Sequence, residues 1–428
     1  MRDVVLIDGY RTPFAKAGTA LAGVHASELG RVAVSELLAR TGVDPKEIDE
    51  VILGNVAQPS ESTNIARVVA LMAGVPEGVP AYTVQRNCAS GMESIAQAHA
   101  KIAAGQAELI IAGGTESMSQ IPLLMSEGLT HMFERLMRAK SPGAKLSALA
   151  SVRPHDFAPR VALAEGLTDP VSGLNMGETA EVLAKEFGIS REAQDDFALA
   201  SHRRAVAAME SGRFAQEIVP VFAPPYKQAV LEDVGPRKGQ TLEALAKLRP
   251  YFDRRFGTVT VGNSCPITDG AAAILVASAD KARALGLRSA GRIKGYAFVG
   301  LDPARMGLGP THATPVALKR AGVAFRDIGL IELNEAFAAQ VIANEIAMAS
   351  AKYCREKLGL EGPIGEIDRA TLNVNGGAIA LGHPVGVSGT RLTLTLLREM
   401  RKRDVQLGLA TLCVGGGQGA ALVLERAA

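Results

Sequence analysis

The most constraining feature of this sequence is a weak internal repeat. Segment 42–55 runs from a glycine into an apolar strand, and it has a counterpart at 322–334, offset by 322 − 42 = 280 residues. A second match pairs Ser90-Gly91 with Ser388-Gly389, and each pair opens a helix-like run that leads into a strand. We expect such a chain to build two similar halves, with chance similarity between two ordinary α/β domains as the alternative.

Within each half, short apolar runs typical of strands alternate with longer periodic runs typical of helices, as in Ser90–Ala104 followed by Leu109–Ile111. This alternation predicts an α/β fold with a mainly parallel sheet covered by helices. Stretch 121–255 differs, because it is rich in proline and poor in strand pattern, which indicates an inserted, mostly helical and looped subdomain. We therefore expect a first half at 1–288, interrupted by this insertion, and a second half at 289–428.

Composition excludes several classes of protein. A net charge of +2 gives no bulk field for nucleic acid, and the four cysteines are far apart with no CxxC pair, so neither a disulfide framework nor a metal site is expected. The chain runs straight into the strand-like Val4–Ile7 without a signal peptide, which favours a cytoplasmic protein. One of the longest apolar runs, 271–279, has nine residues, and a membrane span needs ~18.

Cys88 is the first candidate for chemistry. It lies between a strand-like run, Tyr82–Val84, and a helical pattern that begins near Ser90. A cysteine at a helix N-terminus meets a partial positive charge, which favours the thiolate and so activates the nucleophile. The alternative is a buried structural cysteine, which is common.

His383 is the second candidate, in the glycine-rich turn 376–389 that precedes a helix-like run. By the repeat, Cys88 comes three residues before Gly91 and His383 comes six before Gly389, so the two halves present them from equivalent helix entrances. If the halves pack together, the imidazole can take the proton of the thiol. A structural histidine is the alternative.

Two further segments close strands of the second half. Cys413 stands before the turn Gly415–Gly417, whose N–H groups are suited to an oxyanion. Asn334 and Glu335 follow the strand-like Leu330–Leu333, at the edge where open α/β sheets bind ligands. An ordinary helix cap is the alternative for Asn334.

Together these segments resemble the thiolase family. The resemblance implies a duplicated βαβαβαββ fold, arranged as a five-layer αβαβα sandwich with an inserted helical and loop domain that binds coenzyme A. It also implies a homodimer or homotetramer. The residues that carry it run nearly end to end in the family's order: Asn87–Met92, Ile111–Met118, Met176–Glu181, Asn334–Phe337, Gly382–Pro384 with Gly386, Ser388-Gly389, and Cys413 with Gly415-Gly416.

The resemblance also implies a role for each candidate. Cys88 resembles the acylated nucleophile, His383 the base that activates it, and Cys413 the cysteine that moves the proton of the leaving or attacking group. Asn334 is similar to the residue that holds an oxyanion-hole water beside His383. The backbone N–H groups of Cys88 and Gly415 resemble the second oxyanion hole. The implied contacts to substrate and CoA are Met176, Ser264, Cys265 and Phe337.

The implied reaction is CoA-dependent thiolytic cleavage of 3-oxoacyl-CoA in fatty-acid β-oxidation, with CoA as co-substrate and no metal or redox cofactor. The alternatives are biosynthetic condensation of two acetyl-CoA, a decarboxylating β-ketoacyl synthase-like condensing enzyme, and a non-catalytic CoA- or lipid-binding relative. Segment 231–254 resembles the thiolase subunit of trifunctional complexes, which implies a hydratase–dehydrogenase partner. Asn334, however, stands where those subunits commonly have His.

Segment 124–140 carries apolar residues on one helical face, accompanied by basic residues. Faces of this kind contact a membrane or a partner in some proteins, but more often they belong to a core. We therefore expect this segment to pack over the acyl channel rather than to contact a membrane.

Overall fold

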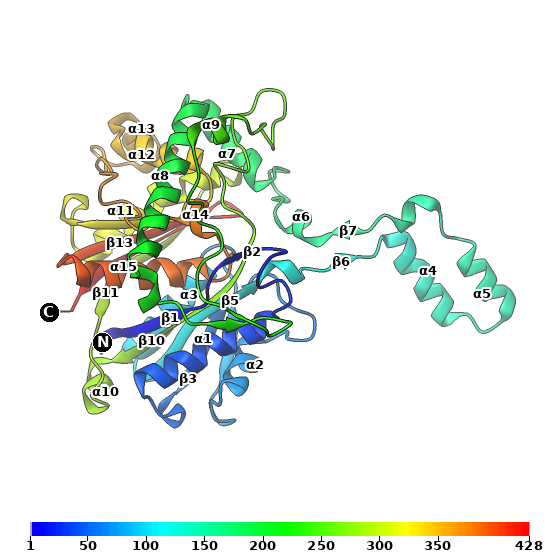
Figure 1. The fold of residues 1–428 in the computed structure, drawn as a ribbon, viewed down its shortest axis with the longest axis horizontal. Coiled ribbons are helices and arrows are strands. Elements are labelled where there is room, and N and C mark those ends of the chain that lie inside the picture. Colours follow the sequence, from blue (N-terminus) through cyan, green and yellow to red (C-terminus); the bar gives the residue numbers. More distant parts are fainter. Residues whose placement is uncertain (1, 428) are drawn as a thin grey trace. The chain divides into compact units, whose positions relative to one another are not determined.

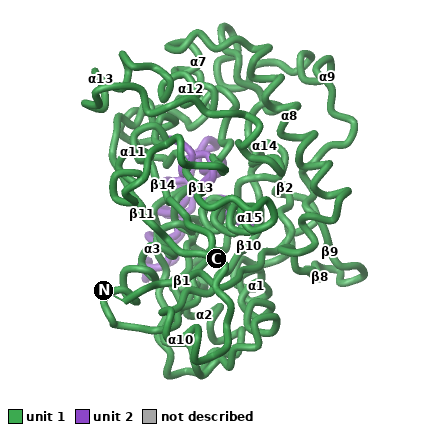
Figure 2. Tube along the Cα trace, turned by 90° about the vertical axis from the view of Figure 1, so that its left-hand side faces the viewer, with its two compact units in different colours: residues 1–119, 169–428 green, residues 120–168 purple. Residues whose placement is uncertain are grey.

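The computed structural model describes residues 2–427. Contacts divide the chain into two compact units, a larger one that runs up to Ser119 and resumes at Asp169, and a smaller one, Gln120–Thr168 (Figure 2). Every candidate for chemistry lies in the larger unit.

A ten-stranded sheet runs through the larger unit and repeats one pattern twice. The first half has the order β4-β3-β5-β10-β1, the second has β12-β13-β14-β11, and β1 meets β11 at Leu6 and Gly291. In each half, parallel pairing at the outer strands is followed by two antiparallel pairs. The expectation of a mainly parallel sheet was therefore wrong, because the last strand of each half returns antiparallel to the strands on either side of it. A bridge between Ile331 and Leu372 takes the place that β4 has in the first half. The predicted duplication is confirmed.

The strands of the first half are β1 (Val4–Arg11), β3 (Glu50–Gly54), β4 (Ala81–Val84), β5 (Leu109–Ser117) and β10 (Thr268–Ser278), with the short β2 (Ala15–Lys16) paired to β10. Those of the second half are β11 (Gly291–Gly300), β12 (Leu330–Leu333), β13 (Leu407–Val414) and β14 (Gln418–Arg426).

Both faces of each half-sheet are buried, which explains the unbroken apolar runs in the sequence. Successive side chains of a strand point to opposite faces. Along β5, Leu109 and Ile111 belong to one hydrophobic core, whereas Ile110 and Ala112 belong to another. Each half-sheet therefore needs a layer of helices on either side.

Helices supply these layers in the predicted five-layer αβαβα order (Figure 1). On the outer face of the first half-sheet lie α1 (Ala26–Thr41) and α2 (Ile65–Met72). On the outer face of the second lie α11 (Gly309–Ala321) and α12 (Ala338–Ala349). Between the half-sheets lie α3 (Ser90–Ala103) and α15 (Ser388–Lys402), one from each half, which pack on each other.

Close packing of α3 on α15 depends on glycine at both helix starts. A Cβ atom added at Gly389 would lie 2.4 Å from the backbone nitrogen of Met92, and one added at Gly91 would lie 2.6 Å from Oγ1 of Thr390. Thr390 Oγ1 in turn donates a hydrogen bond of 3.0 Å to the Gly91 carbonyl. The first turns of the two helices, one from each half, are thereby held in contact.

The predicted insertion 121–255 is divided between the units. Its later part packs within the larger unit as α7 (Met176–Glu186), α8 (Arg191–Glu210), β8 (Val221–Phe222), β9 (Ala229–Val230) and α9 (Leu242–Ala246). The larger unit also contains α10 (Ala279–Ala284), α13 (Ala351–Leu358) and α14 (Ala378–Leu381). Short 3₁₀ turns lie at Pro45–Glu47, Met118–Gln120, Pro154–Phe157, Arg213–Gln216, Pro303–Leu308 and Phe325–Asp327.

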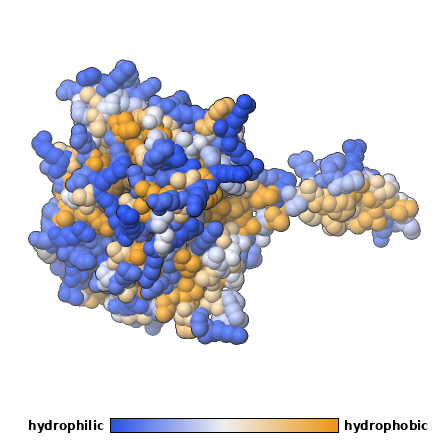
Figure 3. Space-filling model, turned by 45° about the horizontal axis from the view of Figure 1, so that its top comes forward, coloured by the Kyte–Doolittle hydropathy of each residue, from blue (hydrophilic) through white to orange (hydrophobic). Residues whose placement is uncertain are grey.

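The smaller unit is a pair of helices on a two-stranded stem. It comprises β6 (Leu123–Leu124), α4 (Glu127–Arg138), α5 (Pro142–Leu149), β7 (Arg160–Val161) and α6 (Ala162–Gly166), with β6 paired to β7. Met132 is buried, but Phe133 and Met137 are exposed, and apolar surface gathers on this unit (Figure 3). No helix among residues 2–427 is long and apolar enough to cross a membrane.

Candidate active site

Cys88 lies in the turn between β4 and α3, directly before the helix N-terminus. The preceding residue, Asn87, has a left-handed backbone (φ 42°), a conformation that Asn tolerates better than most residues. Its side-chain amide donates a 2.8 Å hydrogen bond to the carbonyl of Gly415. This bond ties the cysteine turn of the first half to the glycine turn of the second.

Burial raises the pKa of the Cys88 thiol above its ordinary value, and the backbone N–H groups of Gly415 and of Cys88 itself only partly oppose this effect. The helix N-terminus was expected to favour the thiolate. The N–H groups do act in that direction, but burial outweighs them, so the net effect favours the protonated thiol. Cys88 is therefore a protonated thiol that requires a base.

His383 has the properties of that base. Its Nδ1 lies 2.5 Å from Oγ of Ser388, and that hydroxyl also lies 3.1 Å from the carbonyl of Pro384. The hydroxyl donates to the carbonyl and accepts from Nδ1–H, which leaves the lone pair on Nε2. Nε2 is buried and has no hydrogen-bond partner among residues 2–427. Burial, followed by the charge of Arg391, lowers the pKa of His383 to about 4, so the imidazole is neutral at pH 7.

The histidine turn packs directly on the cysteine turn. A Cβ atom added at Gly54 would lie 2.7 Å from the carbonyl oxygen of Gly386 and 2.6 Å from the carbonyl carbon of Ser90. Gly386 is three residues after His383, and Ser90 is two after Cys88. Backbone N–H of His383 also bonds Oγ1 of Thr268, at 3.1 Å.

Cys413 and Asn334 meet at the carboxyl ends of the adjacent parallel strands β13 and β12. Backbone N–H of Asn334 donates 3.0 Å to the carbonyl of Thr411, and neither atom of its buried side-chain amide has a partner among residues 2–427. Burial raises the pKa of Cys413 well above its ordinary value, and the charges of Cys88 and Cys265 raise it further. The three sulfur atoms therefore lie within electrostatic reach of one another.

The four residues expected to contact substrate and CoA also surround this site. Met176, the first residue of α7, has its sulfur 3.2 Å from the position of a Cβ at Gly415. Ser264 forms an isolated bridge with Phe337, and the N–H of Cys265 donates 3.0 Å to the carbonyl of Ala336. Burial, followed by the charge of Cys88, raises the pKa of Cys265 to about 12, so this thiol is not ionised at pH 7.

Motif reading missed the role of Glu335, which supports the histidine turn. This buried carboxylate accepts hydrogen bonds from Oγ of Ser201 (2.6 Å), the amide of Asn373 (2.8 Å) and the N–H of Ile379 (3.2 Å). It thereby holds the start of α14, which leads into His383. Its position beside Asn334 was the only signal in the sequence.

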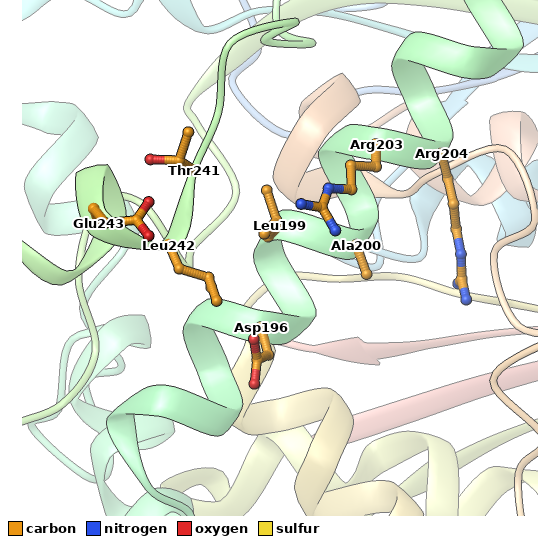
Figure 4. A pocket seen from close by; sticks show the side chains of 8 residues that line it. All are labelled: Asp196, Leu199, Ala200, Arg203, Arg204, Thr241, Leu242 and Glu243. Atoms are coloured by element: carbon orange, nitrogen blue, oxygen red, sulfur yellow. The ribbon is translucent and has the colours of Figure 1, made fainter.

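Neither a metal-binding cluster nor the main surface cavity offers an alternative active site among the described residues. Among residues 2–427, no group of three or more His, Cys, Asp or Glu is arranged to hold a metal ion. A surface cavity of about 520 Å³ lies between α8 and the start of α9 (Figure 4). Charged and polar side chains line it together with Leu199, Ala200 and Leu242, and neither the cysteines nor His383 line it.

A protonated thiol, a neutral imidazole, a second thiol and an unpartnered amide at the centre of a duplicated α/β sandwich define a cysteine-dependent acyltransferase. The thiolase N-terminal domain model matches residues 4–280, and the thiolase C-terminal domain model matches residues 287–426. The chain belongs to the thiolase family.

Individual relatives agree with the family assignment. The 3-ketoacyl-CoA thiolases of Pectobacterium atrosepticum and Yersinia pestis are each 45% identical over 423 residues, 99% of this chain and 96% of those proteins. Two solved structures cover all of this chain and 99% of their own: Bacillus anthracis acetyl-CoA acetyltransferase (TM-score 0.86, 38% identity) and human mitochondrial 3-ketoacyl-CoA thiolase (TM-score 0.86, 37% identity).

Proposed function

We propose that this chain cleaves 3-oxoacyl-CoA with CoA, giving acetyl-CoA and a shortened acyl-CoA, through an acyl group carried on Cys88. The single observation that carries the proposal is the unpartnered Nε2 of a neutral His383, in a turn that packs on the turn of a thiol that requires a base. The names and 45% identity of the bacterial 3-ketoacyl-CoA thiolases support the choice of substrate.

In the first half-reaction, His383 takes the proton of Cys88 and the thiolate attacks the 3-oxo carbon. The bond between C2 and C3 then breaks, which leaves the acyl group on the sulfur and expels the enolate of acetyl-CoA. Cys413, a thiol held in its protonated form by burial, donates its proton to the enolate carbon. Asn334 holds a water that, with His383, stabilises one developing oxyanion, and its unpartnered side-chain amide supports this role. The N–H groups of Cys88 and Gly415 stabilise the other, and their effect on the Cys88 sulfur supports it.

In the second half-reaction, the Cys413 thiolate takes the proton of the incoming CoA thiol. The CoA thiolate attacks the acyl group and releases the shortened acyl-CoA. Cys88 leaves as a thiolate and regains its proton from the imidazolium of His383. The proton of Cys88 returns from His383, the proton of Cys413 stays on the acetyl-CoA product, and the proton of the incoming CoA thiol replaces it on Cys413. The enzyme thus recovers its starting protonation, and the cycle consumes one CoA and needs no metal or redox cofactor.

Replacement of the nucleophile tests this mechanism. We expect Cys88→Ser to lower the rate of CoA-dependent cleavage of a 3-oxoacyl-CoA by about 10⁴-fold or more, because a serine hydroxyl is a far weaker acid than a thiol. Thermal melting should stay within a few degrees of wild type. Undiminished turnover would reject both the mechanism and the role of Cys88.

The second candidate function is the condensation of two acetyl-CoA molecules into acetoacetyl-CoA. The full-length similarity to Bacillus anthracis acetyl-CoA acetyltransferase supports it. Rates of thiolysis against 3-oxoacyl chain length distinguish the two, because a condensing enzyme acts best on acetoacetyl-CoA and a β-oxidation enzyme accepts longer chains. Activity with malonyl carriers alone would instead indicate a decarboxylating condensing enzyme.

We further propose halves at 1–288 and 289–428, a homodimer or homotetramer, a cytoplasmic location and, as a partner, a hydratase–dehydrogenase subunit. Coenzyme A serves as co-substrate, and nucleic acid has no part in the reaction. The substrate contacts assigned to Met176, Ser264, Cys265 and Phe337 belong to the same proposal.

A further inference from the structure

One buried carboxylate joins the two halves of the fold beside the catalytic turn. Glu116, in β5, is completely buried. Its Oε2 accepts from the N–H groups of Gly386 (2.8 Å) and Val56 (3.0 Å). Its Oε1 accepts from the N–H of Ala57 (3.0 Å) and the side-chain amide of Asn55 (3.1 Å). Four donors therefore use the full acceptor capacity of one carboxylate.

No cation offsets this buried charge. Among residues 2–427, no Lys, Arg or His forms an ion pair with Glu116. Burial raises its pKa to about 7, the N–H groups of Ala57, Gly386 and Val56 partly oppose this effect, and the carboxylate of Asp269 adds to it. A buried carboxylate without a counter-ion destabilises a fold unless it satisfies donors that would otherwise be unpaired. Glu116 satisfies N–H groups from both halves, and Gly386 is the one that belongs to the second half.

Gly386 is fixed on both sides. Its N–H is held by Glu116, and its carbonyl packs so tightly that a Cβ added at Gly114 would lie 2.1 Å from the oxygen. His383 lies three residues before Gly386, and Ser388, which holds the imidazole Nδ1, lies two residues after it. A fixed Gly386 therefore fixes both ends of the turn that orients the imidazole.

We propose that Glu116 is a positioning residue for His383, which acts through Gly386 to keep the imidazole Nε2 directed at Cys88. This inference rests on the proposed thiolase mechanism. A direct electrostatic role would act in the opposite direction, because the Glu116 charge raises the pKa of Cys88 and its removal would favour the thiolate. The two roles can therefore be separated by the reactivity of the thiol.

The test is Glu116→Gln in the full-length protein. One orientation of the glutamine amide places its NH2 group against the N–H groups of Gly386 and Val56, and the other places it against the N–H of Ala57 and the amide of Asn55. Either orientation opposes two of the four donors and weakens the network that fixes the turn. We expect kcat for thiolysis to fall about 10- to 100-fold, the effect of a displaced base, with KM for CoA changed less than about threefold. We expect the rate of Cys88 alkylation by iodoacetamide, followed by mass spectrometry of the Cys88 peptide, to fall as well.

The matched control is Glu181→Gln. Glu181 is another buried carboxylate that accepts from backbone N–H groups, those of Thr258 and Val259. The Glu181→Gln variant should lower the melting temperature about as much as Glu116→Gln does, and it should leave the rate of Cys88 alkylation unchanged. In a His383→Ala background, Glu116→Gln should add little further loss, because a residue that acts through the imidazole has nothing left to position.

Three results would overturn the proposal: alkylation of Glu116→Gln at or above the wild-type rate, an equal loss in Glu181→Gln, or a full multiplicative loss in the His383→Ala background. If Glu116→Gln fails to fold, Glu116→Asp keeps the charge but retracts it from Gly386, and the same readouts apply. If the wild-type protein has no thiolase activity, the proposed function fails, and the alkylation rates still decide the role of Glu116.

Discussion

At the residue scale, the site depends on which nitrogen of His383 carries the proton. Ser388 Oγ lies 2.5 Å from Nδ1 and donates its own hydrogen bond to the carbonyl of Pro384, so Nε2 is left as a base. Burial keeps that base neutral, with a pKa of about 4. A neutral base and a protonated thiol form an ion pair only when the base takes the proton of the thiol, which couples activation of Cys88 to the attack on substrate.

Removal of the hydroxyl at position 388 should therefore impair the base. We expect Ser388→Ala to lower kcat about 10- to 100-fold, because the imidazole loses its orientation and its fixed tautomer. Steady-state thiolysis measures this change. Ser388→Thr keeps the hydroxyl and serves as the control, with kcat closer to wild type. Equal losses in the two variants would contradict a role for the hydroxyl.

Much of this site could be predicted from the sequence, since Cys88, His383, Cys413 and Asn334 each stand in a distinctive motif. The direction of the Cys88 pKa could not be predicted, because motif spacing says nothing about how far a thiol is removed from water. Glu116 stood within the segment Ile111–Met118 that resembles the thiolase family, but its role could not be predicted, because its donors come from residues 55–57 and 386, far apart in the chain.

At the element scale, the crossing of α3 and α15 aligns the two catalytic turns. Each helix begins with Ser-Gly, and the glycines allow their first turns to touch. The sequence predicted this equivalence from the repeat of Ser90-Gly91 in Ser388-Gly389. It did not predict that 169–255 packs with the larger unit while 120–168 forms its own, because prolines mark both segments equally.

A methyl group at the crossing should separate the helices. In Gly389→Ala the added Cβ would lie 2.4 Å from the backbone of Met92, so we expect a loss of about 1–3 kcal/mol in the free energy of unfolding, together with reduced kcat. Gly78→Ala is the control, because a Cβ at Gly78 meets open space. Denaturant unfolding and thiolysis rates measure the two effects. The same change in both variants would show that the crossing tolerates the methyl group.

At the scale of the whole molecule, buried titratable groups make stability depend on pH in two directions. His202 is buried in α8, where burial and then the charge of Arg237 lower its pKa to about 4. The contribution of neutral His202 to the free energy of unfolding is complete above pH 6.5. It is lost as the pH falls toward 4, because in this range only the unfolded chain binds the proton. Burial raises the pKa values of Glu116 and Glu332 to about 7. The stability that these two groups contribute to the fold is complete below pH 4.5 and is lost as the pH rises through 7.

A neutral side chain at position 202 isolates the histidine effect. We expect His202→Gln to lose about 1–2 kcal/mol less stability than wild type between pH 7.5 and pH 5, because glutamine can still accept the N–H of Arg237 without taking up a proton. Denaturant unfolding at the two pH values measures the difference. His131→Gln, at an exposed position, should follow the wild type. If the free energy of unfolding of His202→Gln falls with pH as steeply as that of wild type, His202 is not the source of the pH dependence.

The middle layer has a consequence for the origin of the molecule. It is built from one helix of each copy, so a single copy standing alone would leave one face of its sheet in water. An ancestor with only one copy would therefore have had to associate with an identical chain, and fusion of the two genes would have preserved that symmetric pairing. Once fused, the copies were free to diverge, so that one kept the nucleophile and the other the base.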